Sequence, residues 1–269
     1  MENNVVLITG ASSGIGKAIG LFLTARGFKV YGTTRDPGRY PGFSGFKLLQ
    51  LDVRDPISIR KAIATIHENE GGLDILINNA GVGITGPVEE TPREEVIRAL
   101  DINLLGPVAV MNAVLPLMRR QDSGLIINIT SIAGYMGLPF RGYYSASKGA
   151  LVLLTEAFRM ETARSGVRIT SLAPGDFATN IAAGRYHAPI LNDSPYKAAY
   201  EHSLQQMNED VARGQAPSRV AKKVYQIIGT GKPKVHYTVG SPMQRFSLIL
   251  KKLLPDKLYE KLLLNHYKL

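Results

Sequence analysis

The sequence contains no cysteine. It can therefore form no disulfide bond, no thiolate nucleophile and no zinc site built on sulfur ligands. It also lacks a window of 18 uninterrupted apolar residues, and its first ten residues lack the charged and apolar segments of a secretory signal. We therefore expect neither export nor a membrane span, and we predict a cytoplasmic protein.

Acidic residues are scarce in the last fifth of the chain. Residues 219–269 hold eleven lysine or arginine residues and two acidic ones, whereas residues 1–218 hold 21 and 20. No nucleic-acid-binding motif accompanies this basic region, so we expect no nucleic-acid partner. We interpret the region as a solvated face, with an acidic partner or an anionic membrane surface as the alternatives. The five histidines lack the spacing of metal ligands, and we expect no metal site.

The 269 residues, of which 45% are hydrophobic, suffice for one large domain or two small ones. Short apolar runs alternate with segments of helical length, which predicts a parallel sheet covered by helices on both faces. No linker interrupts this pattern, so we predict a single α/β domain over residues 1–269 with a doubly wound sheet of the Rossmann type. Strands are expected at 5–9, 29–33, 46–51, 74–78, 125–130 and 168–172, and helices at 14–26 and 56–70.

Two segments near the end of the chain differ in residue composition from the rest. Residues 176–216 are polar, with a helix expected at 195–213, and we interpret them as a lid over the substrate; an ordinary pair of surface helices is the alternative. Residues 243–269 repeat leucine and lysine, and Pro255 should divide them into two short helices. We expect the apolar faces of these helices to pack on the domain or on a second subunit rather than on a membrane.

A glycine-rich turn follows the first expected strand and begins the first expected helix, with the pattern Thr9-Gly-x-x-x-Gly-x-Gly. At this position in a βαβ unit, free backbone N–H groups and the helix dipole bind the pyrophosphate of a dinucleotide. Glycine permits the close approach of the backbone to the phosphates, although a purely structural turn would use it as well. The predicted phosphate-binding residues are Gly10, Ser12, Ser13, Gly14, Ile15 and Gly16.

This spacing resembles that of the short-chain dehydrogenase/reductase family, and the resemblance extends over about nine-tenths of the chain. The segments 28–36, 136–140 and 237–240 look like the steroid and retinoid branch, which includes the 17-beta-hydroxysteroid dehydrogenases. The resemblance implies that Asn78 ties neighbouring strands together. It also implies a cofactor site that includes Asp52, Val53, Asn79, Ala80, Gly81, Pro174, Gly175, Phe177 and Thr179.

The end of the second expected strand, Thr34-Arg35, bears on the choice of cofactor. NAD-binding enzymes of this fold carry a carboxylate here for the ribose hydroxyls, whereas the Arg35 guanidinium can clamp a 2′-phosphate. We therefore expect NADP(H) to be preferred over NAD(H), with Thr34 and Arg35 in the site. Ser13 replaces a basic residue of many NADP-using relatives, and Asp36 adjoins Arg35, so NAD(H) stays open. Arg35 as a solvated turn residue is a further interpretation.

Tyr144 and Lys148 are four residues apart in a segment of helical character. That spacing places them on one helix face, where the ammonium can lower the pKa of the phenol from its usual value of about 10. Ser131 follows an expected strand and can donate to a substrate carbonyl oxygen, unless it only caps a turn. By the resemblance, Asn103 completes this catalytic set by holding a water near Lys148, and Tyr144 and Lys148 also contact the cofactor. A local kink in a helical run is the alternative for Asn103.

These motifs predict an oxidoreductase that transfers hydride between nicotinamide and a carbonyl or alcohol carbon, with Tyr144 transferring the proton. The expected small-molecule substrate is an apolar ketone or aldehyde of the steroid or retinoid type, and the expected assembly is a homo-oligomer, a dimer or tetramer. A 3-oxoacyl-[acyl-carrier-protein] reductase and a non-catalytic NADP-sensing scaffold stay open as alternatives. Phe177 departs from the small aliphatic residue usual in the family, and Asp176 is likewise unusual, with a polar contact to the substrate as its one proposed role.

Overall fold

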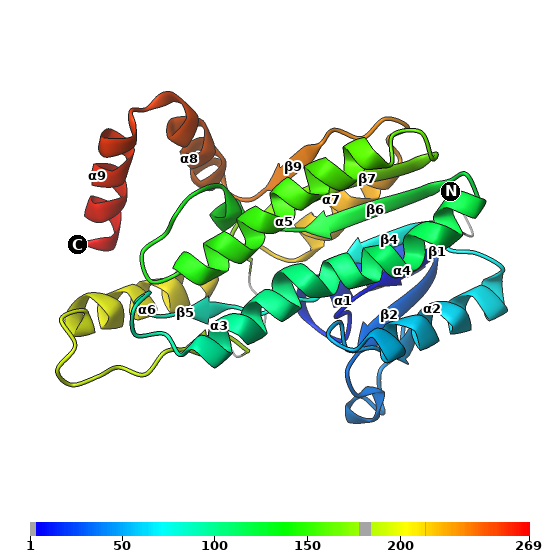
Figure 1. Ribbon diagram of the computed structural model, residues 1–269, viewed down its shortest axis with the longest axis horizontal. Helices are drawn as coiled ribbons and strands as arrows, with labels where there is room; N and C mark the ends of the chain where they lie inside the picture. Colours follow the sequence, from blue (N-terminus) through cyan, green and yellow to red (C-terminus); the bar gives the residue numbers. More distant parts are fainter. Residues whose placement is uncertain (1–3, 178–183, 213) are drawn as a thin grey trace.

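The computed structural model describes residues 4–177, 184–212 and 214–269. Its centre is a sheet of seven parallel strands with helices on both faces (Figure 1). This is the predicted doubly wound α/β fold of the Rossmann type. Across the sheet, the strands follow the order β3 (Lys47–Gln50), β2 (Lys29–Thr34), β1 (Val5–Ile8), β4 (Ile75–Asn78), β6 (Gly124–Ile129), β7 (Val167–Pro174) and β9 (His236–Val239).

The strands are continuously apolar because both faces of the sheet are buried. In β1, Val5 and Leu7 belong to one core cluster, whereas Val6 and Ile8 belong to the other. The other strands and the helices on each face complete these clusters. The helices are α2 (Pro56–Glu70) and α4 (Gly106–Arg120) on the first face, and α1 (Gly14–Thr24) and α7 (Ser218–Ile228) on the second.

One helical run, Arg93–Arg120, is long and apolar enough to span a membrane by length and composition. It consists of α3 (Arg93–Leu100), the π-helical turn η2 (Asp101–Leu105) and α4. Val110, Met111 and Val114 of this run are fully buried in the first core cluster, so we interpret it as a core helix. The π-turn contains the predicted site residue Asn103, and such turns often occur at functional sites.

Several of the segments that follow β7 lie outside the main sheet. The short strand β8 (Tyr186–His187) pairs with β5 (Ile84–Thr85), and α6 (Lys197–Ala212) follows it, close to the expected helix. Pro255 separates α8 (Pro242–Leu253) from α9 (Asp256–Tyr267), as predicted. The strand β9 was not expected from the sequence; it extends the sheet beside β7, which runs two residues further than predicted.

The parallel strands all end at one edge of the sheet, so the segments that follow them meet there. The register aligns Ile8 with Gly32 and Ile77, and Asn78 with Asn128. In such a fold, ligands bind beyond this carboxyl edge. The remaining elements near it are the 3₁₀ turns η1 (Pro37–Arg39) and η3 (Ile132–Tyr135) and the helix α5 (Gly142–Glu161).

Candidate functional site

The glycine-rich turn between β1 and α1 is fastened to the end of β4. The Thr9 hydroxyl accepts hydrogen bonds from the backbone N–H groups of Asn79 (2.9 Å) and Ala80 (3.0 Å). The side-chain amide of Asn79 donates in return to the carbonyl oxygens of Thr9 (2.9 Å) and Gly10 (3.0 Å). These bonds hold the turn and the end of β4 as one unit.

The turn has the backbone of a phosphate cradle. Gly10 (φ +65°) and Gly14 (φ +56°) adopt the left-handed conformation that favours glycine. Ser13, at the N-cap of α1, makes no side-chain capping hydrogen bond, which leaves the first-turn N–H groups uncapped by this residue. These features fit the pyrophosphate of a dinucleotide, which such a helix N-terminus binds through N–H groups and its dipole.

Gly16 allows the turn to lie close to Asn79. A Cβ atom at position 16 would lie 2.5 Å from Asn79 Nδ2 and 2.6 Å from the carbonyl oxygen of Gly10. We expect Gly16→Ala to lower the free energy of unfolding by about 1–3 kcal/mol, because the turn must move, and to weaken cofactor binding about tenfold or more. Thermal unfolding and an NADPH fluorescence titration measure both effects.

The matched control for this substitution is Gly231→Ala, because no atom lies within 4 Å of the added Cβ there. It should change the free energy of unfolding by less than about 0.5 kcal/mol. Equal stability and equal NADPH affinity in Gly16→Ala and in the parent protein would contradict the cradle.

A buried hydrogen bond joins the neighbouring strands β4 and β6 near this edge. Asn78 Nδ2 donates to Asn128 Oδ1 at 2.9 Å, and both residues are almost fully buried. This confirms the tie that the sequence predicted for Asn78. The bond fixes the register next to the segment that carries Asn79.

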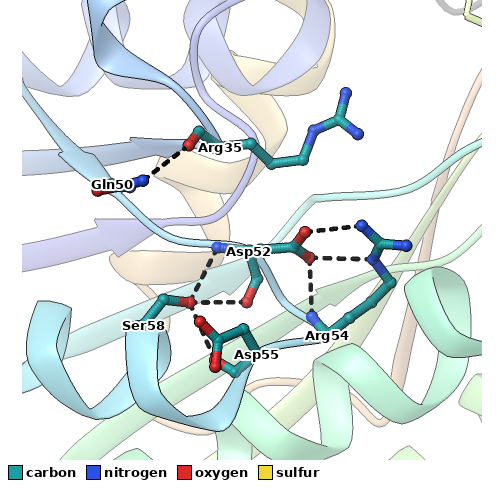
Figure 2. A network of polar contacts seen from close by, with 6 residues as sticks. All are labelled: Arg35, Gln50, Asp52, Arg54, Asp55 and Ser58. Atoms are coloured by element: carbon teal, nitrogen blue, oxygen red, sulfur yellow. Dashed lines mark hydrogen bonds and ion pairs between the residues drawn. The ribbon is translucent and has the colours of Figure 1, made fainter.

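The end of β2 and the segment after β3 carry the residues that the sequence predicts beside the cofactor ribose. Figure 2 shows Asp52 held by Arg54, whose Nη2 and Nε atoms donate to the carboxylate at 2.8 and 3.2 Å. The hydrogen bond from Arg54 lowers the pKa of Asp52, and the positive charge of Arg35 contributes to the same direction. Asp52 therefore stays ionised, with its carboxylate oriented by Arg54.

The Arg35 guanidinium is exposed and lies outside the Asp52–Arg54 pair (Figure 2). Asp36, its neighbour in sequence, instead accepts hydrogen bonds from the backbone N–H of Gly38 (3.0 Å) and from Arg39 Nε (3.3 Å). Asp36 is thus engaged within η1. The Asp36 carboxylate is hydrogen-bonded to Gly38 and Arg39, and no hydrogen bond joins it to Arg35 among the described residues.

The four predicted catalytic residues come together from three separate elements. Tyr144 forms a hydrogen bond with Ser131, which precedes η3. Asn103 Nδ2 donates to the hydroxyl of Ser147 (3.2 Å), which donates to the Tyr144 carbonyl oxygen (2.8 Å). Lys148 Nζ donates to the Ile129 carbonyl oxygen at 3.1 Å.

Gly81 is the point at which Asn103 and Lys148 approach the predicted cofactor segment. A Cβ atom at Gly81 would lie 3.1 Å from Asn103 Oδ1 and 3.3 Å from Lys148 Nζ. Asn103 also forms two hydrogen bonds with the backbone of Val82: its Oδ1 accepts from the Val82 N–H (2.8 Å), and its Nδ2 donates to the Val82 carbonyl oxygen (2.9 Å). The π-turn therefore fixes the chain just after β4 beside the lysine.

The pKa of Tyr144 shifts in the direction opposite to the one expected from the sequence. Burial raises the pKa of this phenol, and the hydrogen bond with Ser131 and the charges of Arg141 and Arg185 offset the rise only in part. Lys148 is not among the groups that shift it, and its ammonium binds the Ile129 carbonyl oxygen instead. The sequence reading expected Lys148 and the positively charged oxidised nicotinamide to lower this pKa together; of these two, Lys148 does not contribute in this conformation.

Burial lowers the pKa of Lys148 to about 8. Its unfolded value is about 10.5, so between these two pH values the unfolded chain binds more protons and stability rises with pH. At pH 7 the buried ammonium destabilises the fold. We expect Lys148→Met to raise the free energy of unfolding by about 1–3 kcal/mol at pH 7, and the difference to shrink towards pH 10.

Urea unfolding of both proteins at the two pH values measures this effect. Lys61→Met, at an exposed position of α2, is the matched control and should change stability by less than about 0.5 kcal/mol. A Lys148→Met protein that is less stable than its parent at pH 7 would show that the ammonium stabilises the fold.

Sequence reasoning missed two arginines near Tyr144. Arg141 lies three residues earlier at the N-cap of α5, a spacing that could have indicated it. Arg185 lies beside β8, and its side chain packs over Gly83; its Nη1 atom is buried without a hydrogen-bond partner among the described residues. Both charges favour the phenolate form of Tyr144. No local pattern could have linked Arg185 to Tyr144.

Gln244 is a further residue that the sequence reading missed. Its Nε2 atom donates to Asp176 Oδ2 at 2.6 Å, and its Oε1 atom packs over Gly175. Gln244 also completes a capping box with Ser241 at the start of α8, and the Ser-x-x-Gln pattern could have indicated this. Asp176 thus connects the end of β7 to the C-terminal helices.

The predicted cofactor residues lie along the carboxyl edge of the sheet. Phe177 is 3% exposed and packs in the second core cluster, so its side chain serves the core. Thr179 lies outside the described residues. Each group of predicted residues lies at or just after the end of one strand. The groups are, after β1, Gly10, Ser12, Ser13, Gly14, Ile15 and Gly16; at β2, Thr34 and Arg35; after β3, Asp52 and Val53; after β4, Asn79, Ala80 and Gly81; and at β7, Pro174 and Gly175.

The model of the family described as short chain dehydrogenase matches residues 4–189. The chain belongs to this family. A curated relative from Bacteroides thetaiotaomicron, named 3-ketodihydrosphingosine reductase, is 36% identical over 97% of this chain and 96% of its own length. The human 17-beta-hydroxysteroid dehydrogenase type 1 is 34% identical over 95% of this chain and 82% of its own. These relatives confirm the resemblance to the steroid branch.

Solved structures agree with this assignment. A short-chain dehydrogenase from Streptomyces avermitilis superposes with a TM-score of 0.81, at 29% identity, over 100% of this chain and 97% of its own. The protein is accordingly an oxidoreductase of the short-chain dehydrogenase/reductase family, which uses nicotinamide cofactors.

Proposed function

We propose that this short-chain dehydrogenase is an NADP(H)-dependent carbonyl reductase and alcohol dehydrogenase that acts on apolar ketones or aldehydes. The convergence of Tyr144, Ser131 and Lys148 at the edge that carries the glycine-rich turn is the observation that supports it most. The exposed Arg35 guanidinium, with Asp36 engaged elsewhere, supports the choice of NADP(H).

In this proposal, the nicotinamide supplies hydride during reduction and takes it during oxidation. Ser131 donates to the carbonyl oxygen and polarises it, and Tyr144 gives that oxygen its proton. Arg141 and Arg185 stabilise the phenolate that Tyr144 leaves behind, since both favour its charged form. Lys148 holds the cofactor ribose, and Asn103 holds a water that returns a proton from solvent.

Two named relatives support an apolar substrate. One is named for the reduction of a keto group in a sphingoid lipid and the other for a hydroxysteroid, both of which join a carbonyl or hydroxyl group to a large hydrocarbon. We infer that the present site takes a ketone of this class. Because cores of one family carry different specificities, the substrate itself must be assayed.

We propose that α6 is part of a lid over the substrate, and its contacts support this. The Tyr200 hydroxyl in α6 donates to the Thr85 carbonyl oxygen (3.0 Å), and its ring lies 5.3 Å from that of Phe140. Met207, also in α6, accepts from Arg141 Nε through its sulfur at 2.7 Å. These contacts place α6 next to the residue that starts the Tyr144 helix, where it would cover a bound substrate.

The proposed assembly is a homo-oligomer. On α5, the large apolar side chains of Leu153 and Met160 are exposed, which suits a contact with a second copy. Analytical ultracentrifugation of the full chain measures the oligomeric state. The cytoplasmic location stays a prediction.

A substrate panel tests the proposed function. Steroid ketones, retinal, a 3-keto long-chain base and small aldehydes are each assayed with NADPH and with NADH. We expect turnover of at least one large apolar ketone, with a higher kcat/KM for NADPH. Activity only on carrier-bound 3-oxoacyl groups, lost at high salt, would instead indicate the carrier-protein reductase. Tight NADPH binding without turnover of any carbonyl would indicate a scaffold.

A further inference from the structure

One face of α8 is apolar and exposed. Met243, Phe246, Ile249 and Leu253 have exposed fractions between 51% and 75%. Their spacing of three, three and four residues places them within an arc of about 120° on the helix surface. A stripe of large apolar side chains in water is unusual on a soluble surface and indicates a contact.

The side of α8 that adjoins this arc is attached to the rest of the protein. Leu248, Leu250 and Leu254 pack against the buried cluster around η3, which includes Ile132 and Met136. The capping box and the bond from Gln244 to Asp176 fix the start of the helix. The four residues of the stripe nevertheless stay exposed beside this packed side.

The neighbouring helix α9 also carries exposed apolar side chains. Leu258 and Leu262, one turn apart, are 47% and 43% exposed. The buried residues of α9, Tyr259 and Tyr267, lie on its other side, where the Tyr259 hydroxyl donates to Met136 Sδ at 3.0 Å. The C-terminal surface is defined here as the apolar residues Met243, Phe246, Ile249, Leu253, Leu258 and Leu262.

Basic side chains border the C-terminal surface. Arg245 and Lys252 are exposed and fall next to the apolar arc of α8, and Lys257 and Lys261 are exposed on α9. Residues 242–269 hold six lysine or arginine residues and two acidic ones. One of the acidic residues, Asp256, is paired with Lys251 at 2.8 Å. The border is thus strongly positive.

The positive charge around the C-terminal surface distinguishes between two binding partners, a second copy of the chain and a lipid bilayer. A second copy that met the same surface in a symmetric dimer would bring like charges together, which is unfavourable. A lipid bilayer with anionic headgroups instead offers apolar chains to the stripe and negative charge to its border. We propose that the C-terminal surface docks the protein onto anionic lipid bilayers.

The surface lies next to the site edge. Figure 1 shows α8 and α9 at one end of the molecule, with α9 close to α6, and Gln206 Nε2 in α6 donates to the His266 carbonyl oxygen at 3.5 Å. On the site side, Gln244 touches Gly175. Docking would therefore bring the bilayer beside the elements around the site, where an apolar substrate dissolved in lipid is within reach. The docking itself does not depend on which reaction the site performs.

Vesicle sedimentation of the full chain tests the proposal. We expect the protein to sediment with vesicles of phosphatidylcholine and phosphatidylglycerol, much less with phosphatidylcholine alone, and to be released by high salt. Phe246→Ser/Ile249→Ser should weaken binding to the mixed vesicles about tenfold or more, because two side chains no longer enter the lipid. Arg245→Gln/Lys252→Gln should weaken it about fivefold for each charge removed.

Matched controls use equally exposed residues elsewhere. Ile57→Ser on α2 removes an apolar side chain that is 69% exposed, and Arg219→Gln/Lys222→Gln removes two exposed charges from α7. Both should bind vesicles like the parent. Unchanged far-ultraviolet circular dichroism and thermal unfolding show that each variant is folded.

Several results would overturn the proposal. One is the absence of sedimentation with anionic vesicles, which needs no variant. Another is equal binding by the parent and by Phe246→Ser/Ile249→Ser. A third is a dimer in analytical ultracentrifugation that this variant abolishes while vesicle binding is absent, since the surface would then join two copies.

Discussion

Tyr144→Phe is expected to lower turnover of a ketone with NADPH about a thousandfold, while NADPH affinity changes by less than about twofold. The substitution removes one hydroxyl, which is the proton donor in the proposed reaction. Ser131 and Lys148 keep their positions, because neither backbone nor packing changes. Steady-state assays measure turnover, and fluorescence titration measures the affinity.

Tyr143→Phe is the matched control, because it removes the same atom one residue earlier. The Tyr143 hydroxyl donates to the Val88 carbonyl oxygen at 3.0 Å and is not part of the Ser131 cluster. We expect this variant to keep turnover within about threefold and to lose about 1 kcal/mol of stability at most. A Tyr144→Phe enzyme that retained a tenth of the parent rate would rule out the acid/base role.

Arg35→Asp is expected to reverse cofactor preference by a factor of about a hundred or more in the ratio of kcat/KM for NADPH and NADH. The guanidinium would otherwise form charge-assisted hydrogen bonds to the 2′-phosphate, worth about 1.5–3 kcal/mol. The introduced carboxylate repels that phosphate and can accept the ribose hydroxyls of NAD(H). Because Arg35 is exposed, the fold should keep its stability.

Arg60→Ser provides the control, because it replaces an exposed arginine of α2 and leaves the pair of Arg39 and Asp36 intact. Its loss should leave the ratio unchanged. If Arg35→Asp also left the ratio unchanged, Arg35 would be a solvated turn residue and the preference for NADP(H) would have another cause.

The sheet and the phosphate turn could be predicted because their signals are local. Continuous apolar strands, as in β1, reflect burial on both faces, and the glycine spacing reflects a backbone that lies against Asn79. By contrast, β9 has four partly buried residues at the edge of the sheet and gave no such pattern. Its partner is β7, more than 60 residues earlier in the chain, so only the tertiary fold creates it.

The sequence predicted which residues form the site better than it predicted the pKa values of those residues. The spacing of Tyr144 and Lys148 predicts a shared helix face, but the pKa of each group depends on its burial. Burial raises the pKa of Tyr144 and lowers that of Lys148, so both groups are held towards their neutral forms. The charge of Arg185 lowers the pKa of Tyr144. Arg185 lies beside β8, about forty residues further along the chain, and no periodicity of the sequence indicates that the two residues interact.

The hydrogen bond from Gln244 to Asp176 connects the C-terminal helices to the segment after β7, next to the predicted cofactor residues Pro174 and Gly175. A gene shortened before codon 242 would encode the whole sheet and every proposed catalytic side chain. The product would nevertheless expose the carboxylate of Asp176 and leave the loop at Gly175 without the amide that covers it. Chain shortening should therefore weaken cofactor binding, although it removes only sequence beyond the last strand.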